Sequence, residues 1–221
     1  MTTIGEPTQW AGLIDSMVPD ILKLIVATWE EMPSPKSDDK EDEITVALCR
    51  ALQQNRTARQ LMFQIRPQVV ELEPAAGEDV GRMDIVFIFL VPREDIYFCL
   101  ESKRLNVLRD GDTRSYASEY VTFGMLRFVS GQYAKSVRHG AMVGYVLDGD
   151  LARAIANVQA NITANSTILC MSPPGVLSPS TILTSDPRAK ETMHRRPHDG
   201  LPFFLHHLFM AAAKIEANQA A

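Results

Sequence analysis

The chain has 221 residues, 46% of them hydrophobic and 22% charged, which is enough for one domain that buries a substantial core. Its formal net charge of -5 argues against a protein that coats nucleic acid over its whole surface, because that affinity comes mainly from lysine and arginine. A local basic patch or a partner subunit would still allow DNA binding. The longest apolar runs, such as residues 85–91, are too short to cross a bilayer, so no membrane span is expected.

The three cysteines are Cys49, Cys99 and Cys170. They are widely spaced and form neither a disulfide framework nor a zinc pattern. The first residues lack the basic start and the apolar core of a secretory signal. We therefore expect a reduced, cytoplasmic protein.

The N-terminal quarter predicts two helices. Residues 10–32 place apolar side chains at the helical period of 3.6 residues. Residues 33–39 contain two prolines and read as a connector, after which a second helix is expected over residues 40–54. Its first turn carries Glu41, Asp42 and Glu43, where negative charge suits the helix dipole.

A three-stranded meander is expected next. Residues 62–73 roughly alternate between apolar and polar, and Pro67 within them favours an edge strand or a bulge. Strands at 82–91 and 96–103 follow, separated from their neighbours by turns at 74–81 and 92–95. Beyond them we expect the following elements, in chain order: a polar loop at 106–115, a helix at 116–137, a buried strand at 141–147, a helix at 150–161, a long loop with one short strand at 172–186, and a C-terminal helical segment.

Three charged residues converge on this meander. Glu101 and Lys103 are two positions apart at the end of the third strand, so both side chains project from the same face. Asp84 lies in the preceding strand, among apolar residues, and antiparallel pairing would bring it close to Glu101. Burying such carboxylates is costly unless a cation neutralises them. Since Mg²⁺ prefers oxygen ligands, Asp84 and Glu101 predict a metal site, with the Ser102 carbonyl as a third ligand.

A metal at this place would suit hydrolysis of a phosphodiester. The cation polarises the phosphate and lowers the pKa of a bound water. Lys103 would orient or help to deprotonate that water, or stabilise charge on the phosphate.

The segment Gly81-Arg82-Met83-Asp84-Ile85-Val86, followed by Glu101-Ser102-Lys103, resembles the D...ExK signature of the PD-(D/E)XK nuclease superfamily. The resemblance covers residues 40–147, less than half of the chain, and the proline of the superfamily's name is replaced by Met83. It implies a restriction-endonuclease-like fold with Mg²⁺ or Mn²⁺ as cofactor. By position, it assigns Glu43 as a further metal ligand, with Glu41 as second choice. It also suggests Gln132 as a catalytic glutamine, although the spacing found in one branch of the superfamily is absent.

Each assignment has a structural alternative. Asp84, Glu101 and Lys103 would otherwise form a salt bridge at a sheet edge. Glu43 would be a solvated acid that serves the helix dipole, and Gln132 an amide on a helix surface.

Basic residues in the second half are candidates for DNA contacts. Arg127 lies within the aromatic and glycine-rich stretch 120–133, which would otherwise pack in the core, and Lys135, Arg138 and His139 follow it; these four could contact phosphates. Arg196 stands near four histidines (His194, His198, His206 and His207) that fit no zinc pattern. These residues are expected to form a basic surface near the scissile strand, or to pack the C-terminal helix.

The sequence therefore predicts an α/β domain with a central mixed sheet flanked by helices. An N-terminal helical extension would span residues 1–36, the nuclease core 37–171, and a C-terminal loop and helical segment 172–221.

The expected activity is Mg²⁺- or Mn²⁺-dependent cleavage of DNA, more by endonuclease than by exonuclease action. Because no sequence-reading module is evident, an ATPase or sensor partner, or a homo-oligomer, is expected to direct it. The resemblance suggests an effector of prokaryotic antiphage defence. The rivals are a non-catalytic interaction subunit with the same fold and an RNase using the same site.

Overall fold

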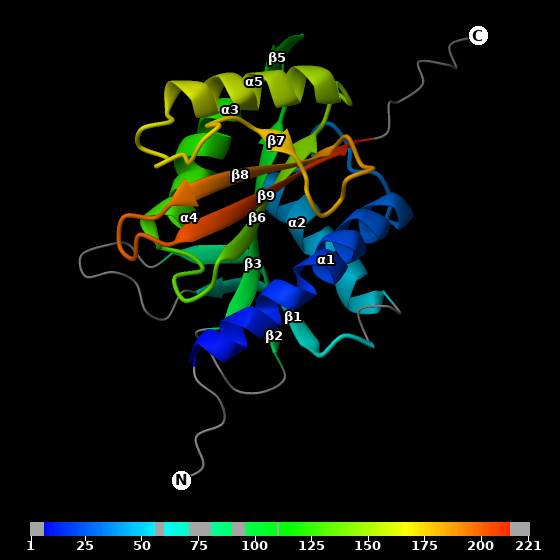
Figure 1. Cartoon of the computed structure of the whole chain (residues 1–221). Coiled ribbons are helices and arrows are strands. Elements are labelled where there is room, and N and C mark those ends of the chain that lie inside the picture. Colours follow the sequence, from blue (N-terminus) through cyan, green and yellow to red (C-terminus); the bar gives the residue numbers. More distant parts are fainter. Residues whose placement is uncertain (1–6, 56–59, 71–80, 90–95, 110, 213–221) are drawn as a thin grey trace.

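The computed structural model describes residues 7–55, 60–70, 81–89, 96–109 and 111–212, with the backbone alone for residues 7–11. Within these ranges, seven strands form a mixed sheet in the order β1-β2-β3-β6-β9-β8-β7, with helices on both faces (Figure 1). The predicted α/β class and central mixed sheet are thus confirmed. None of the described helices combines the length and apolarity needed to cross a membrane.

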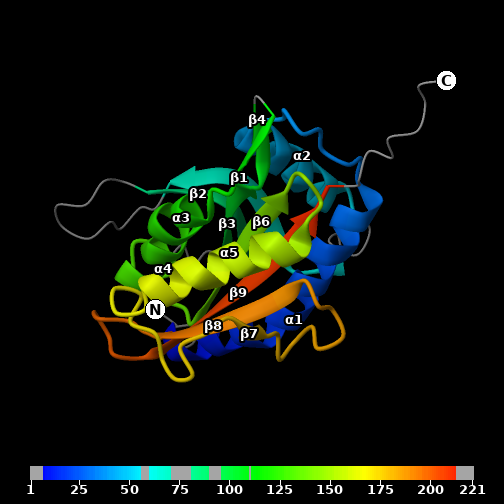
Figure 2. The ribbon, with the colours of Figure 1, turned by 90° about the horizontal axis from the view of Figure 1, so that it is seen from above.

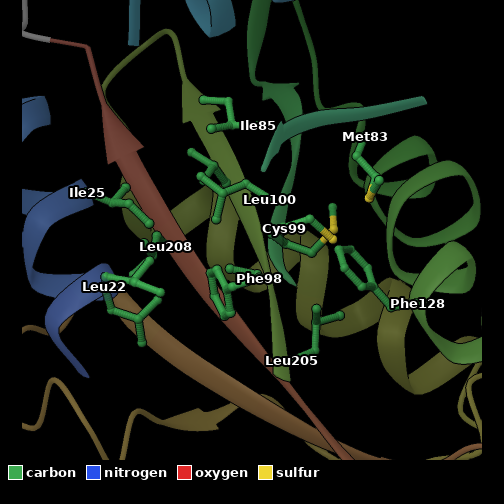
Figure 3. Packing of buried hydrophobic residues seen from close by; sticks show 14 of the residues in the cluster. Leu22, Ile25, Met83, Ile85, Phe98, Cys99, Leu100, Phe128, Leu205 and Leu208 are labelled. Atoms are coloured by element: carbon green, nitrogen blue, oxygen red, sulfur yellow. The ribbon is translucent and has the colours of Figure 1, made fainter. Parts of the chain in front are cut away.

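The two N-terminal helices form where the apolar periodicity predicted them. Helix α1 spans Pro7–Glu31 and α2 spans Glu41–Gln54. Both pack on one face of the sheet, and Figure 3 shows Leu22 and Ile25 of α1 pointing toward the sheet residue Leu208. All three side chains are buried, so this apolar layer supplies much of the hydrophobic driving force.

The predicted meander is also present. Strands β1 (Phe63–Val70), β2 (Arg82–Phe89) and β3 (Tyr97–Leu105) pair antiparallel. β1 lies at the sheet edge. Proline has no N–H to donate, and an edge strand tolerates Pro67 because it pairs with a neighbour on one side only. The turns expected at 74–81 and 92–95 lie outside the described residues, apart from Gly81.

The helix expected over residues 116–137 is shorter and irregular. It consists of α3 (Ala117–Tyr120), a π-helix labelled η2 (Val121–Met125) and α4 (Leu126–Ser130). Gly131 ends it with a φ of +83°, a left-handed conformation that glycine adopts without steric cost. The prediction was therefore wrong beyond Ser130. The loop expected before it contains a small hairpin of β4 (Val107–Arg109) and β5 (Asp112–Arg114).

The second half of the domain continues the sheet. Strand β6 (His139–Val146) runs parallel to β3, and helix α5 (Leu151–Ala164) follows it, as predicted. In Figures 1 and 2, α3, α4 and α5 cover the face opposite α1 and α2. The long loop contains the expected short strand, β7 (Ser178–Pro179).

The prediction of a C-terminal helical segment was wrong for the described residues. Strands β8 (Ala189–Arg195) and β9 (Pro202–Ala211) stand there, and β9 inserts between β6 and β8. β9 is almost wholly buried, because helices cover both faces of the sheet around it. A strand buried on both faces is a continuous apolar run, which periodicity alone does not separate from a buried helix.

Three of the four C-terminal histidines form internal contacts and not the expected basic surface, whereas His198 is exposed and lies 3.2 Å from Asp199. His194, His206 and His207 are at most 2% exposed. Burial lowers the pKa of His194 to about 4 and that of His206 to about 3, so both are neutral at physiological pH. His207 bridges Tyr120, at 2.9 Å, and Thr192, at 2.8 Å.

Arg196 is likewise an internal residue, which corrects its assignment to DNA binding. It is 2% exposed, and its guanidinium donates to the carbonyls of Ala134, Lys135 and Val137 and to the carboxylate of Asp199. These bonds tie the chain after β8 to the segment between α4 and β6. A guanidinium used in this way has no donor surface left for a phosphate.

We expect the substitution Arg196→Ala to lower the free energy of unfolding by about 3 kcal/mol, because it leaves several buried acceptors unpaired. The neighbouring Arg195 is exposed, so Arg195→Ala should change it by less than about 0.5 kcal/mol. Urea denaturation of the three proteins measures both values. Equal stabilities for the two variants would contradict the structural role of Arg196.

Candidate active site

The structure brings Asp84, Glu101 and Lys103 together. Lys103 Nζ lies 2.8 Å from Glu101 Oε1 and 2.7 Å from the carbonyl oxygen of Ser102. The Ser102 N–H donates to Asp84 Oδ2 at 2.7 Å. Alternation along β3 places Glu101 and Lys103 on the same face, as the sequence predicts. Glu101 is only 1% exposed, so it requires internal partners.

Arg127 supplies the second cation to Glu101. Its Nη1 lies 2.7 Å from the same Oε1 that receives Lys103. Tyr133 fixes this guanidinium: its hydroxyl accepts from Arg127 at 3.0 Å and donates to the Arg82 carbonyl at 2.8 Å. Sequence reasoning had proposed Arg127 as a DNA contact and had given Tyr133 no role.

The helix acid that reaches the cluster is Glu41 and not Glu43. Glu41 Oε1 lies 3.0 Å from Lys103 Nζ, and its Oε2 accepts from the Arg104 N–H at 2.9 Å. The Glu43 carboxylate instead accepts from the Lys40 N–H at 2.9 Å, which is half of a capping box. Residues two apart on a helix point in opposite directions, so only one of these acids can face the site.

Lys135 and Arg138 lie outside this hydrogen-bonded cluster. Gln132 is half-buried, and its side chain packs beside Gly81. Lys135 is exposed. Arg138 forms an ion pair with Asp15 of α1, on the opposite side of the sheet from Glu101.

Ser102 is held from the opposite face of the sheet. Tyr145 of β6 donates to its hydroxyl at 3.1 Å, and Thr45 of α2 lies 3.2 Å from the same Tyr145 oxygen. The Tyr145 ring stacks on Trp29 of α1 with centroids 5.4 Å apart. Both N-terminal helices therefore help to fix the strand segment that presents Glu101 and Lys103.

The π-helix allows a close approach to Glu101. A Cβ at Gly124 would lie 2.3 Å from the Met142 side chain and 3.8 Å from Glu101 Cγ. A larger residue at this position would therefore require the Met142 side chain to move. π-turns inside helices frequently occur at functional sites, and this one brings Gly124 against Glu101 and leaves its neighbour Phe123 exposed.

Burial and mutual repulsion make the two carboxylates unusually hard to ionise. Burial and then the charge of Asp84 raise the pKa of Glu101 to about 7, although Lys103 and Arg127 oppose this. Burial also raises the pKa of Asp84 to about 6, against the effects of Lys103 and the Ser102 N–H. Burial alone would lower the pKa of Lys103, but the carboxylates of Glu101, Glu41 and Asp84 outweigh it and raise that pKa. Perturbed groups of this kind are enriched at functional sites.

The donor set fits a hard divalent cation. Glu101 Oε2 is buried and has no hydrogen-bond partner among the described residues. Asp84 accepts from the Ser102 N–H, and the Ser102 carbonyl accepts from the Lys103 that also contacts Glu101. In the described part of the chain, no group of three or more His, Cys, Asp or Glu side chains is arranged to hold a metal. Two carboxylates and a carbonyl are nevertheless sufficient for Mg²⁺, which keeps several of its waters.

Comparisons of the chain with protein-family models, with curated proteins and with solved structures gave no match. The chemistry of the site must therefore be inferred from the residues of this chain.

The raised pKa of Glu101 predicts a pH-dependent stability. In a chelator, the folded protein holds the Glu101 proton up to about pH 7, whereas its ordinary pKa is 4.5. The folded state thus binds more protons between these values, and stability contributed by this group falls as the pH rises through them. Glutamine does not ionise, so as the pH rises through this range the free energy of unfolding of Glu101→Gln should increase by about 3 kcal/mol relative to that of wild type.

Urea denaturation of both proteins from pH 4.5 to pH 7 measures this difference. The buried histidines destabilise the folded protein as the pH falls, because they must then take up a proton. This contribution is the same in both proteins and cancels in their difference. Parallel stability curves for the two proteins would show that Glu101 ionises without penalty.

Proposed function

We propose that this protein is a metal-dependent nuclease that hydrolyses phosphodiester bonds in DNA, with a restriction-endonuclease-like core. The observation that carries the proposal is the buried Glu101 carboxylate. One of its oxygens receives two cationic side chains, and the other has no hydrogen-bond partner among the described residues. Asp84 is close enough for its charge to raise the pKa of Glu101. Most buried polar atoms are hydrogen-bonded, so an unpaired carboxylate oxygen near a second acidic side chain is a candidate ligand for a cation.

Asp84 and Glu101, with the Ser102 carbonyl, would hold Mg²⁺ or Mn²⁺. When bound, the ion polarises a phosphate oxygen and lowers the pKa of a coordinated water. Its charge also favours the ionised form of both carboxylates and so opposes the penalty that raises their pKa values. Glu41 stands at the edge of the same cluster and adds negative charge there.

Lys103 acts as a cationic hydrogen-bond donor. Three acidic neighbours raise its pKa, so it is an ammonium at neutral pH and a poor general base. It is suited to orient the attacking water and to stabilise the charge that develops on the phosphate. Arg127, one third exposed, holds Glu101 in place and presents the rest of its guanidinium to the surface.

Two open pockets give access to these cations. A pocket of about 250 Å³ is lined by Glu41 and Lys103, and one of about 460 Å³ is lined by Arg127 and Gln132. A phosphate in either pocket would meet one of the two cations that hold Glu101. This arrangement favours a chain-like substrate over a small enclosed one.

The charge of the protein suggests that a partner contributes to DNA binding. Its net charge is -5, and Arg138 and Arg196 are engaged within the protein. Since affinity for DNA depends on phosphate neutralisation, an ATPase or sensor subunit, or a second copy of the chain, would supply the remaining contacts. The resemblance of the Asp84 and Glu101-Ser102-Lys103 segments to PD-(D/E)XK nucleases makes a prokaryotic antiphage defence complex the proposed setting.

Wild type is expected to cut circular plasmid and circular single-stranded DNA in Mg²⁺ or Mn²⁺, but not in EDTA. Glu101→Gln and Lys103→Ala should each lower the rate by at least about a hundredfold, the effect of removing one charge-stabilising group. Agarose electrophoresis of the products measures these rates. Because circular substrates have no ends, their cleavage also establishes endonuclease action.

The two acids of α2 give a matched control. Glu41→Gln should impair cleavage, whereas Glu43→Gln should leave it unchanged, because glutamine keeps the capping bond. Cleavage of a structured RNA in place of DNA would assign the site to an RNase. A protein that cuts none of these substrates, alone or with its partner, would be the non-catalytic alternative.

Metal binding is testable without activity. Mg²⁺ at a hundred times its dissociation constant should stabilise wild type by about 2.7 kcal/mol. Asp84→Asn and Glu101→Gln should each remove most of this gain, because each deletes one carboxylate ligand. Thermal unfolding with Mg²⁺ or EDTA measures it, and equal stabilisation of all three proteins would place the ion elsewhere.

A further inference from the structure

Phe123 is exposed where an apolar side chain is expected to be buried. It is 60% exposed, and it lies on the π-helix, next to Gly124, which packs against Glu101. Val121 and Met125, two residues before and two residues after Phe123, are fully buried. The irregular turn thus directs one aromatic ring outward at the site while its neighbours fill the core.

The ring lies between the two pockets that lead to the cations. Phe123 lines the pocket of Lys103 and Glu41, and it also lines the pocket of Arg127 and Gln132. Lys103 and Arg127 both contact the same oxygen of Glu101. A substrate that spans both pockets must therefore pass over this ring.

We propose that Phe123 stacks against an unpaired nucleobase of single-stranded DNA, adjacent to the phosphate that Lys103 receives. This inference rests on the proposed nuclease function and names its substrate class. A bare aromatic ring flanked by cations matches the alternation of base and phosphate along a single strand. In a duplex the base faces are covered by their neighbours, so the ring has no partner there unless a base is splayed out.

The larger pocket is suited to the edge of the stacked base. It carries the polar residues Thr122, Ser130 and Gln132 beside the apolar Leu126 and Ile168. Hydroxyl and amide groups can donate to or accept from any base edge, so this pocket does not by itself impose a sequence. The expected preference is for unpaired over paired DNA.

The test uses a single-stranded oligonucleotide that contains 2-aminopurine, whose fluorescence is quenched when it stacks on an aromatic ring. Binding is measured in Ca²⁺, which takes the same oxygen ligands as Mg²⁺. Wild type and Phe123→Tyr should both bind and quench. Phe123→Leu, which keeps an apolar side chain without a ring, should lose the quenching and raise the dissociation constant about tenfold or more.

A control is Leu201→Ala, which alters another exposed apolar residue, 53% exposed, and should behave as wild type. Equal quenching by wild type and Phe123→Leu, or no binding of the strand by wild type, would overturn the proposal.

The same proteins in Mg²⁺ separate this proposal from the nuclease function. Phe123→Leu should cut circular single-stranded DNA about tenfold more slowly than wild type at limiting substrate. If it cuts this substrate as fast as wild type, the nuclease stands and the stacking role fails. If wild type binds the strand and quenches its fluorescence but cuts no substrate, the stacking role stands and the nuclease function fails.

Discussion

The site depends on one constraint: a carboxylate that has been removed from water must be neutralised. Glu101 is buried in the middle of the sheet, and burial raises its pKa to about 7 even with two cations in contact. Lys103 and Arg127 reach it from different elements, and Tyr133 in turn fixes Arg127. Gly124 lets the irregular helix close over the group. Loss of Glu101 would leave the partly buried Lys103 and Arg127 without their common partner.

The two faces of the sheet divide the work. Leu22 and Ile25 of α1 pack on one face with buried apolar residues of the strands (Figure 3). On that face Tyr145 donates a hydrogen bond to the Ser102 hydroxyl of the site strand. Glu101 projects from the other face, where the covering helix is irregular and one ring is left exposed. A rigid apolar layer behind β3 thus holds the charged layer in front of it, which is what a preorganised site requires.

The basic residues of the C-terminal half stabilise the fold in place of forming an open cationic surface. Arg196 donates to backbone carbonyls, Arg138 pairs with Asp15, and His207 lies between Tyr120 and Thr192. The contacts of Arg196 and His207 join the end of β8 and β9 to the rest of the domain. The cations that contact the buried Glu101 carboxylate are Lys103 and Arg127.

The sequence by itself located most elements in the first three-quarters of the chain and the central pair of the candidate site. Period-3.6 and period-2 patterns are local, so they located α1, α2, the meander and β6, and the i,i+2 spacing put Glu101 and Lys103 on one face. Only the tertiary structure decided between Glu41 and Glu43, because that choice depends on the rotation of α2 against β3. It also turned an expected C-terminal helix into strands and expected DNA contacts such as Arg196 into buried ties. Burial on both faces and pairing with distant carbonyls are long-range properties, which no window of neighbouring residues contains.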